Sequence, residues 1–266
     1  MKVRGQRPVA LRLMDLSYVC RDVRVDVGSR RVLDGVSFVV GRGEFVSIMG
    51  SSGVGKTTLL RTLAGLQRSV AGSTVRLEGV DVVGPPERVS LVFQDYSSSL
   101  LPWRTVARNV ELPLEREVKS KAERRARVDE ALEMVGLGDR GADRPFELSG
   151  GMQQRVQIAR ALVSRPAVVL MDEPFGAVDA LTKASLEDQL LELVSLMGTT
   201  VVFVTHDMDE AVYLSDRVLV LGGAPAAVVA EVEVGCPRPR SQLSTRSSAE
   251  FLSARRSVHE AIFGRV

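Results

Sequence analysis

The sequence predicts an α/β fold with a parallel-rich central sheet, antiparallel strands near its N-terminal end and an inserted helical subdomain. Three observations predict this fold. Short apolar runs alternate with helix-like segments in both halves of the chain, which is typical of a doubly wound sheet. A strand–loop–helix unit surrounds a glycine-rich motif at 50–57. A helical texture at about 95–158 interrupts the alternation, so we expect it to form the subdomain.

The expected elements of the first half are mostly strands. The glycine-rich stretch 41–43 ends one strand, and a helix over 58–64 follows the motif. The segment 21–30 is expected to be a lengthened loop. The ranges expected to form strands are 11–13, 32–33, 36–40, 45–49, 72–83 and 89–93.

The second half begins with helices and returns to strands. Ser120 and Glu123 have the spacing of a capping box, and the helix that they open is predicted to end at Gly136. A helix with an apolar stripe over 186–197 follows, and strands are expected at 168–171, 201–204 and 218–221. We therefore expect one domain over 9–235, with the helical subdomain at about 95–158, and a tail over 236–266 that carries a short helix.

The composition disfavours several function classes. The 35 Lys and Arg against 33 Asp and Glu give a formal net charge of +2, so no strong field favours nucleic acid as a partner. Every apolar stretch is shorter than the ~18 residues of a membrane-spanning helix, and Arg12 interrupts the one apolar run that a signal peptide would need. Cys20 and Cys236 have no metal-type spacing, so we expect reduced thiols in a cytosolic protein.

The motif at 50–57 predicts a site for the phosphates of a nucleoside triphosphate. Glycines let the backbone approach the phosphates, and the N–H groups at the helix start point at the anion. Lys56 adds a positive charge for the β- and γ-phosphates, and the Thr57 hydroxyl can ligate Mg²⁺. The strand–loop–helix context disfavours the alternative, a plain glycine-rich turn before a core helix. The expected phosphate-binding residues are Gly50, Ser51, Ser52, Gly53, Val54, Gly55, Lys56, Thr57 and Thr58.

Two acids follow the apolar strand at 168–171. Asp172 at the strand end is expected to face the glycine-rich loop, where it can hold Mg²⁺ through water molecules. Glu173 points in another direction and can position or deprotonate an attacking water. An acidic turn after an ordinary strand is the alternative, and the loop motif upstream favours the catalytic interpretation.

Three further elements complete the set of motifs. Residues 148–155 read L-S-G-G-M-Q-Q-R, in which a Ser and two glycines open a helix. This is a second helix N-terminus that can bind an anion. Gln94 follows the strand over 89–93. His206 follows the strand over 201–204 and shares a sheet edge with the two acids, so it could contact a γ-phosphate oxygen.

This order of motifs resembles the ATPase subunits of ATP-binding-cassette (ABC) transporters over nearly the whole chain. The resemblance implies a P-loop NTPase core of the ABC type that binds and hydrolyses ATP with Mg²⁺. It implies that Gln94 senses Mg²⁺ and the membrane partner, and that His206 is the switch histidine. The stretch 177–179 looks like the D-loop, with Val178 where Leu is usual. In this family the L-S-G-G-M-Q-Q-R stretch at 148–155 is called the signature. The residues of the signature and the D-loop that are then expected to contact ATP are Ser149, Gly150, Gly151, Gln153 and Asp179.

The same resemblance implies a homodimer. Two copies are expected to pack head to tail, with Ser149 and Gly151 of each copy on the γ-phosphate held by the other. Hydrolysis removes those contacts, so the pair reopens. The family stacks adenine on an aromatic residue near the N-terminus, where this chain has Cys20 in the usual frame and Tyr18 as the nearest aromatic. We favour Tyr18, and both positions stay open.

The segment 100–106, L-L-P-W-R-T-V, is similar to nitrate/sulfonate/taurine-type importers. In that group the region receives a coupling helix from a membrane subunit, so Trp103 is expected at the contact. A core or surface anchor without a partner is the alternative for Trp103. The implied partners are transmembrane permease subunits and a separate substrate-binding protein, at the cytoplasmic face of the cell membrane. Nitrate, an alkanesulfonate, taurine, bicarbonate and a pyrimidine precursor all remain open as solutes.

Two other functions compete with transport. Soluble cassette ATPases of DNA repair or translation typically have two cassettes or long coiled coils, and this chain has one cassette and no sustained heptads. A regulatory module that holds ATP without turnover is disfavoured by the presence of Glu173, Gln94 and His206 together. An ATPase subunit of an importer is therefore the leading hypothesis.

Overall fold

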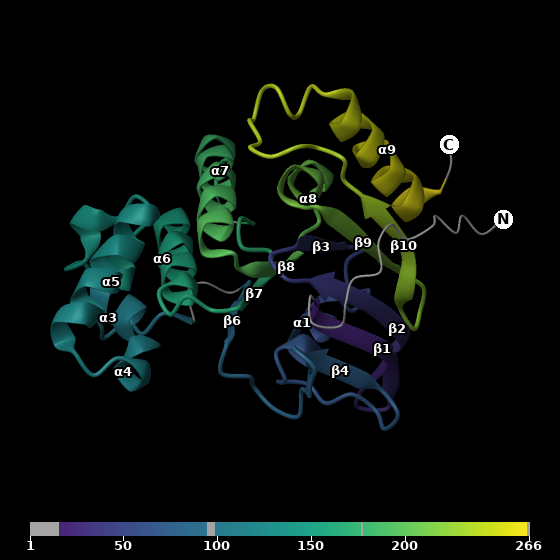
Figure 1. Ribbon diagram of the computed structural model, residues 1–266, viewed down its shortest axis with the longest axis horizontal. Coiled ribbons are helices and arrows are strands. Elements are labelled where there is room, and N and C mark those ends of the chain that lie inside the picture. The colour runs from purple at the N-terminus through teal and green to yellow at the C-terminus, as the bar shows by residue number, and fades with distance from the viewer. Residues whose placement is uncertain (1–15, 95–98, 177, 265–266) are drawn as a thin grey trace.

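The computed structural model describes residues 16–94, 99–176 and 178–264 (Figure 1). The strand predicted over 11–13 lies outside them, as does Ala177 of the D-loop stretch. Within the described residues, a six-stranded sheet has the order β10-β9-β3-β8-β7-β6, parallel throughout except for β10. Its strands are β3 (Phe45–Met49), β6 (Val89–Val92), β7 (Val168–Asp172), β8 (Thr200–Val204), β9 (Arg217–Gly222) and β10 (Ala227–Glu233).

A smaller antiparallel sheet in the order β2-β1-β4-β5 lies beside it among the described residues. The prediction of a loop over 21–30 is wrong, because β1 continues to Val27 and pairs with β2 across a short turn. Val23 and Val25 are fully buried and alternate with polar residues, which is the period-two pattern of a half-buried strand. The bounds are β1 (Leu16–Val27), β2 (Arg30–Gly41), β4 (Thr74–Leu77) and β5 (Val80–Asp81).

The first core lies between the two sheets, with the helix α1 (Lys56–Leu63) inside it. Leu59, Leu60 and Leu63 of α1 pack with one set of alternating side chains from the large sheet, among them Val46 and Ile48 of β3. The strands β3, β7 and β8 are buried on both faces, which explains why they read as continuous apolar runs.

The second core covers the other face of the large sheet. The helices α7 (Ala180–Met197) and α8 (Met208–Leu214) pack here. A helical group beside β6 and β7 contains α3 (Val106–Glu111), α4 (Leu114–Glu117), α5 (Lys121–Met134), η2 (Gly138–Arg140), η3 (Pro145–Glu147) and α6 (Gly150–Leu162) (Figure 1). Ser120 caps α5 by accepting a hydrogen bond from the Glu123 N–H at 3.3 Å, and Gly136 follows the helix with φ at 65°, as predicted.

The residues after β10 are fixed on this second layer by two arginines and a helix. Arg240 donates to the carbonyl oxygen of Tyr213 at 2.5 Å, at the end of α8. Arg246 lies 2.7 Å from a carboxylate oxygen of Glu187 in α7 and 4.7 Å from the centre of the Tyr213 ring. The helix α9 (Ala249–Phe263) then buries Phe251, Ala254 and Val258 against the core.

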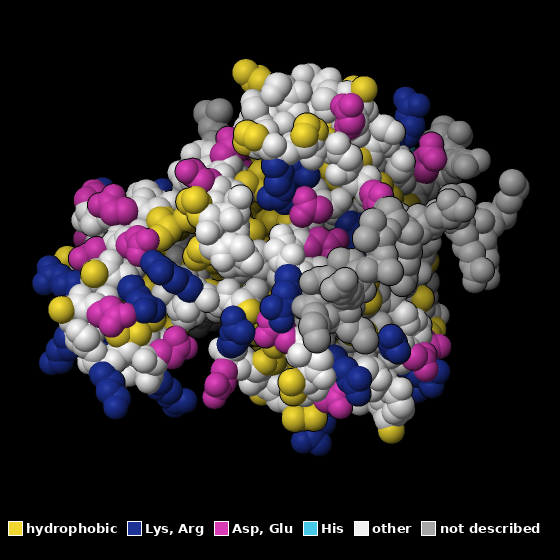
Figure 2. All heavy atoms as spheres, in the orientation of Figure 1, with side chains coloured by type: hydrophobic (Ala, Val, Ile, Leu, Met, Phe, Trp, Pro, Cys, Tyr) yellow, Lys and Arg dark blue, Asp and Glu magenta, His cyan; other side chains and the backbone are white. Residues whose placement is uncertain are grey.

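The visible surface mixes both signs of charge (Figure 2). Several arginines of the helical group are paired, such as Arg124 with Glu111 at 2.8 Å and Arg127 with Glu123 at 2.6 Å. This mixture agrees with the small formal net charge of +2. Among the described residues, no helix combines the length and apolarity that crossing a membrane requires.

Candidate functional site

The glycine-rich motif at 50–57, which we call the P-loop, connects β3 to α1 and includes the first residues of the helix. A Cβ added at Gly50 would lie 2.5 Å from the carbonyl oxygen of Leu221, so no side chain fits there. Gly55 has φ at 114°, and its added Cβ would come within 2.9 Å of the Leu33 side chain. Gly55 is also the N-cap of α1 and offers no side-chain cap, which leaves the first N–H groups of the helix for an anion. The loop therefore has the shape that phosphate binding requires.

Lys56 spans this loop. Its Nζ donates to the carbonyl oxygens of Gly50 at 3.0 Å and Ser51 at 3.1 Å, which holds the ammonium at the loop. Among the other predicted phosphate-binding residues, Ser51, Ser52 and Gly53 are exposed, and Val54, Thr57 and Thr58 are half-buried.

Thr57 and Asp172 meet next to the loop. The Thr57 hydroxyl donates to the Asp172 carboxylate; burial raises the pKa of Asp172, and this hydrogen bond opposes the rise. A hydroxyl beside a carboxylate suits Mg²⁺, which takes oxygen ligands and keeps several waters. The described residues contain no cluster of three or more His, Cys, Asp or Glu that could hold a metal ion alone. A magnesium ion bound here would therefore share its coordination with water and phosphate oxygens.

Gln94, Glu173 and His206 converge at one edge of the large sheet. The Gln94 amide donates to Glu173 Oε2 at 3.0 Å, and His206 Nδ1 lies 3.2 Å from the same oxygen. The three residues follow β6, β7 and β8, which are adjacent parallel strands whose carboxyl ends meet at this edge. The structure thus brings together three side chains that the sequence places after strands.

Glu173 has a left-handed backbone with φ at 47°. This conformation costs a residue with a side chain about 1–3 kcal/mol and recurs at functional sites. The Glu173 N–H still donates to the Val204 carbonyl at 2.9 Å, so the chain turns directly after β7. The turn separates the two acids: Asp172 contacts Thr57, and Glu173 contacts Gln94 and His206.

The L-S-G-G motif forms the start of α6. Ser149 caps the helix by accepting from the Met152 N–H at 3.3 Å, and Gly150 and Gly151 lie half-buried in the first turn. The Gln153 amide donates to the carbonyl oxygens of Pro145 and Leu148. Among the described residues, none of these hydrogen bonds reaches the P-loop of the same chain, and α6 lies with the helical group, beyond β6 and β7 from α1 (Figure 1).

The D-loop residues lie beside this helix start. Asp179 caps α7 by accepting from the Thr182 N–H at 3.1 Å. The Val178 side chain lies 3.9 Å from the position that a Cβ on Gly151 would take. The structure therefore places the D-loop and the signature together in one chain.

The assignment of Tyr18 as the residue that stacks on the base is wrong. Tyr18 is fully buried, and its hydroxyl donates to the Leu63 carbonyl of α1 at 2.9 Å. Burial raises the pKa of this hydroxyl. Cys20 lies two residues along the same strand and is 1% exposed, so the other open position is buried as well. Both side chains belong to the core between the sheets.

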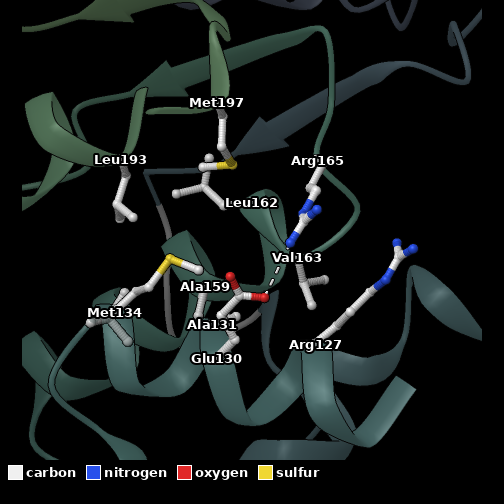
Figure 3. A pocket seen from close by; sticks show the side chains of 11 residues that line it. Arg127, Glu130, Ala131, Met134, Ala159, Leu162, Val163, Arg165, Leu193 and Met197 are labelled. Carbon is white, nitrogen blue, oxygen red and sulfur yellow. Dashed lines mark hydrogen bonds and ion pairs between the residues drawn. The ribbon is translucent and has the colours of Figure 1, made fainter. Parts of the chain in front are cut away.

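A small hollow lies away from these motifs, between α5, α6 and α7 (Figure 3). Met134, Leu193 and Met197 line it, and the ion pair of Glu130 with Arg165 crosses it at 3.2 Å. Its free volume of about 20 Å³ is close to that of one water molecule. The hollow is therefore too small to hold a nucleotide.

Comparison with known proteins identifies the family. A family model described as ABC transporter matches residues 33–176, which include the P-loop, both acids and the signature. This match covers more than half of the chain. The chain belongs to the ABC transporter family.

Relatives within the ABC transporter family include importer ATP-binding proteins. The chain is 45% identical to the bicarbonate transport ATP-binding protein CmpC of Synechocystis sp. over 236 residues, which are 88% of this chain and 35% of that protein. It thus spans about a third of the length of the first relatives that it matches. It is 44% identical to the aliphatic sulfonates import ATP-binding protein SsuB 1 of Xanthomonas axonopodis pv. citri, over 87% of this chain and 93% of that one.

A solved ABC cassette shares the fold. The dimeric structure of a post-hydrolysis state of the ATP-binding cassette MJ0796, bound to ADP and Pi, aligns with a TM-score of 0.72. The identity is 33%, and the alignment covers 81% of this chain and 98% of that chain. This likeness confirms the predicted ABC-ATPase fold.

Sequence reasoning missed a charged cluster next to His206 in this member of the ABC transporter family. Lys183 of α7 lies 2.7 Å from Asp207 and 3.2 Å from Glu210, both at the start of α8. The Thr205 hydroxyl donates to Glu210, and Asp207 caps α8. A lysine one helical turn after Asp179, with two acids after His206, is the only sequence signal. The pairing depends on how α7 and α8 pack, which the local pattern does not give.

Glu210 should make stability depend on pH. Burial raises the pKa of Glu210 from 4.5 to about 7. Between pH 4.5 and pH 7, Glu210 therefore keeps its proton in the folded state and loses it in the unfolded chain. This contribution to stability is full below pH 4.5 and is lost as pH rises through 7. Two and a half pKa units correspond to ~3 kcal/mol. We expect Glu210→Gln to gain up to that much stability relative to the parent protein between pH 5 and pH 8.

Urea unfolding at several pH values measures this difference. Glu250→Gln makes the same chemical change at an exposed position of α9 and is the control for the loss of a carboxylate. A Glu210→Gln difference from the parent that does not change with pH would show that Glu210 titrates alike in both states.

Proposed function

We propose that this chain is the ATP-binding and ATP-hydrolysing subunit of an ABC importer. The observation that carries the proposal is the convergence of Gln94, Glu173 and His206 at the sheet edge, in a chain whose P-loop, Thr57 and Asp172 form a site for a triphosphate with Mg²⁺. The relatives with the importer names support the transport role.

The arrangement assigns a step to each side chain. The P-loop N–H groups and Lys56 bind the β- and γ-phosphates, and Thr57 and Asp172 would hold Mg²⁺, which neutralises phosphate charge when bound. Glu173 orients a water molecule and accepts its proton as the water oxygen bonds to the γ-phosphorus and the bond to the β–γ bridging oxygen breaks. Gln94 and His206 fix the Glu173 carboxylate from two sides.

The signature helix supports a head-to-tail homodimer. Ser149 caps α6 and Gly151 lies in its first turn, where backbone N–H groups have no partner within the helix, in a part of the chain that lies away from its own P-loop. A second copy placed head to tail would bring this helix start to the γ-phosphate, with Gly150, Gln153 and Asp179 beside it. The dimeric state of the solved cassette supports this arrangement.

The partners proposed here are permease subunits, which bind at the helical group, and a separate substrate-binding protein. Trp103 and Phe146 are 69% and 71% exposed, and the Trp103 carbonyl accepts a hydrogen bond from Arg144 at 2.6 Å, so the two aromatic residues lie on neighbouring segments. Exposed aromatics of this kind mark protein contacts. The chain would then lie at the cytoplasmic face of the membrane. Its proposed ATPase domain spans 9–235 and contains the helical subdomain at about 95–158.

The proposed solute is a small oxyanion. Bicarbonate and aliphatic sulfonates, the solutes in the names of two relatives, each carry a charged oxygen-rich group. Nitrate and taurine share that chemistry. The choice among them would be made by the permease and substrate-binding protein, because these contact the solute.

Replacing Trp103 by Ala should weaken docking to the permease. A buried interface tryptophan typically contributes 2 kcal/mol or more, so we expect affinity to fall about 30-fold while the ATPase rate of the isolated chain is kept. Co-purification with the co-expressed permease subunits of the same operon measures it. Phe263→Ala removes an equally exposed aromatic from α9 and is the control. Equal recovery of the permease with both variants would exclude the Trp103 surface as the docking site.

A further inference from the structure

A second hollow lies beside the P-loop, on the side of β2. Three segments line it: 30–32 at the start of β2, 51–54 of the P-loop and 223–226 between β9 and β10. Its volume of about 200 Å³ is below the ~300–1,000 Å³ of complete ligand pockets, so it would take one end of a nucleotide and not the whole molecule. Neither Asp172 nor any of the three converging residues lines it. A nucleotide with its γ-phosphate at Glu173 would therefore place its opposite end here.

Backbone hydrogen bonds fix the walls of this hollow. The Asp34 N–H donates to the Ala226 carbonyl, and the Ala226 N–H donates to the Val32 carbonyl, each at 2.9 Å. The Val32 side chain lies 3.0 Å from where a Cβ of Gly55 would stand, so it packs directly against the P-loop. The site is thus built before a ligand arrives.

The two arginines of the hollow differ in what they contact. Arg31 donates to Asp26 at 2.7 Å and to Asp34 at 3.2 Å, so its guanidinium is already committed. Arg30 is exposed, and its guanidinium forms no hydrogen bond or ion pair with the other described residues, although its backbone pairs with Val27 in the hairpin. Arg30 is therefore the cation that remains available to a ligand in this hollow.

The lining contains no aromatic ring. Within the first 50 residues the aromatics are Tyr18, Phe38 and Phe45, and each is at most 3% exposed. A base bound here would meet the aliphatic face of Val32 and a guanidinium plane. Such planes stack on every base, because each base has a π face, and they do not read hydrogen-bonding edges.

We propose that the nucleobase is held between Val32 and Arg30, and that the chain consequently accepts nucleoside triphosphates with little choice of base. This inference rests on the proposed function, since it assumes that the P-loop binds a triphosphate. It assigns to Arg30 a role in affinity for the base, separate from the phosphate contacts of Lys56.

Equilibrium binding of Mg-ATP, Mg-GTP, Mg-CTP and Mg-UTP to the Glu173→Gln variant tests this by titration calorimetry, because that variant should bind without turnover. The four dissociation constants should agree within about threefold. Adding Arg30→Ala should weaken all four by about three- to tenfold and leave the affinity for Mg-tripolyphosphate unchanged. Arg125→Ala, which removes an exposed arginine of α5, is the control and should change none of these values.

Two results would overturn the inference. One is a preference for ATP over CTP and UTP of more than about tenfold. The other is an Arg30→Ala variant that loses tripolyphosphate affinity as much as ATP affinity, or loses neither. The proposed function fails differently: none of the four nucleotides would bind or be hydrolysed.

Discussion

Glu173→Gln should nearly abolish ATP hydrolysis while keeping ATP bound. Glutamine keeps the size of the side chain and can still meet Gln94 and His206, but it cannot accept the proton of the attacking water. General-base catalysis contributes about 10²- to 10⁴-fold, so the phosphate release rate should fall by that factor. In the proposed cycle the closed pair opens only after hydrolysis, so the variant should accumulate as a dimer with Mg-ATP, which gel filtration would detect.

Glu250→Gln is the matched control, since it makes the same chemical change at an exposed position of α9. It should keep the rate of the parent protein and show no dimer that depends on ATP. If Glu173→Gln hydrolyses ATP as fast as the parent protein, Glu173 is not the base, and the mechanism proposed above is wrong.

Two inactive variants should restore activity when they are mixed. Lys56→Ala damages a P-loop, and Ser149→Arg places a long cation at the start of α6, so each homodimer would have two defective sites. In a head-to-tail heterodimer, the intact P-loop of one protomer faces the intact signature of the other. A random 1:1 mixture should therefore recover about a quarter of the parent rate, provided that the two sites act independently.

Phosphate release from the separate and mixed proteins measures this recovery. Mixing Lys56→Ala with a Lys56→Ala/Ser149→Arg double variant is the control, because no arrangement of those chains yields an intact site. Recovery in the control mixture, or a Ser149→Arg homodimer with the full parent rate, would contradict the shared site.

The parallel sheet could be predicted because its strands are buried on both faces and read as short apolar runs. The hairpin of β1 and β2 was not predicted, although Val23 and Val25 alternate with charged residues. Arg24 and Asp22 form an ion pair at 2.6 Å on the polar face of this hairpin, and their charges resemble those of a loop. Burial of Val23 and Val25 favours the strand over a loop, and the charged residues between them determine only which face of the strand contacts water.

The convergence of Gln94, Glu173 and His206 was predictable for a topological reason: residues after adjacent parallel strands meet at one edge. The base site was not predictable in the same way. Tyr18 and Cys20 share one face of a strand, because side chains repeat every two residues, and that face lies under α1. Which face of a strand is covered depends on the packing of distant elements, as does the pairing of Lys183 with Glu210.

The residues after β10 contact α7 and α8, and these contacts determine when the fold can be completed during synthesis. Glu187 is fully buried, and its cationic partner, Arg246, is translated 59 residues later. A nascent chain that stops before Arg246 leaves the Glu187 carboxylate without its cationic partner. It also leaves exposed the apolar surface that α9 covers. Completion of this part of the fold is thus postponed until Arg246 and α9 have been synthesised, and copies that terminate earlier expose apolar surface, which proteases and chaperones recognise.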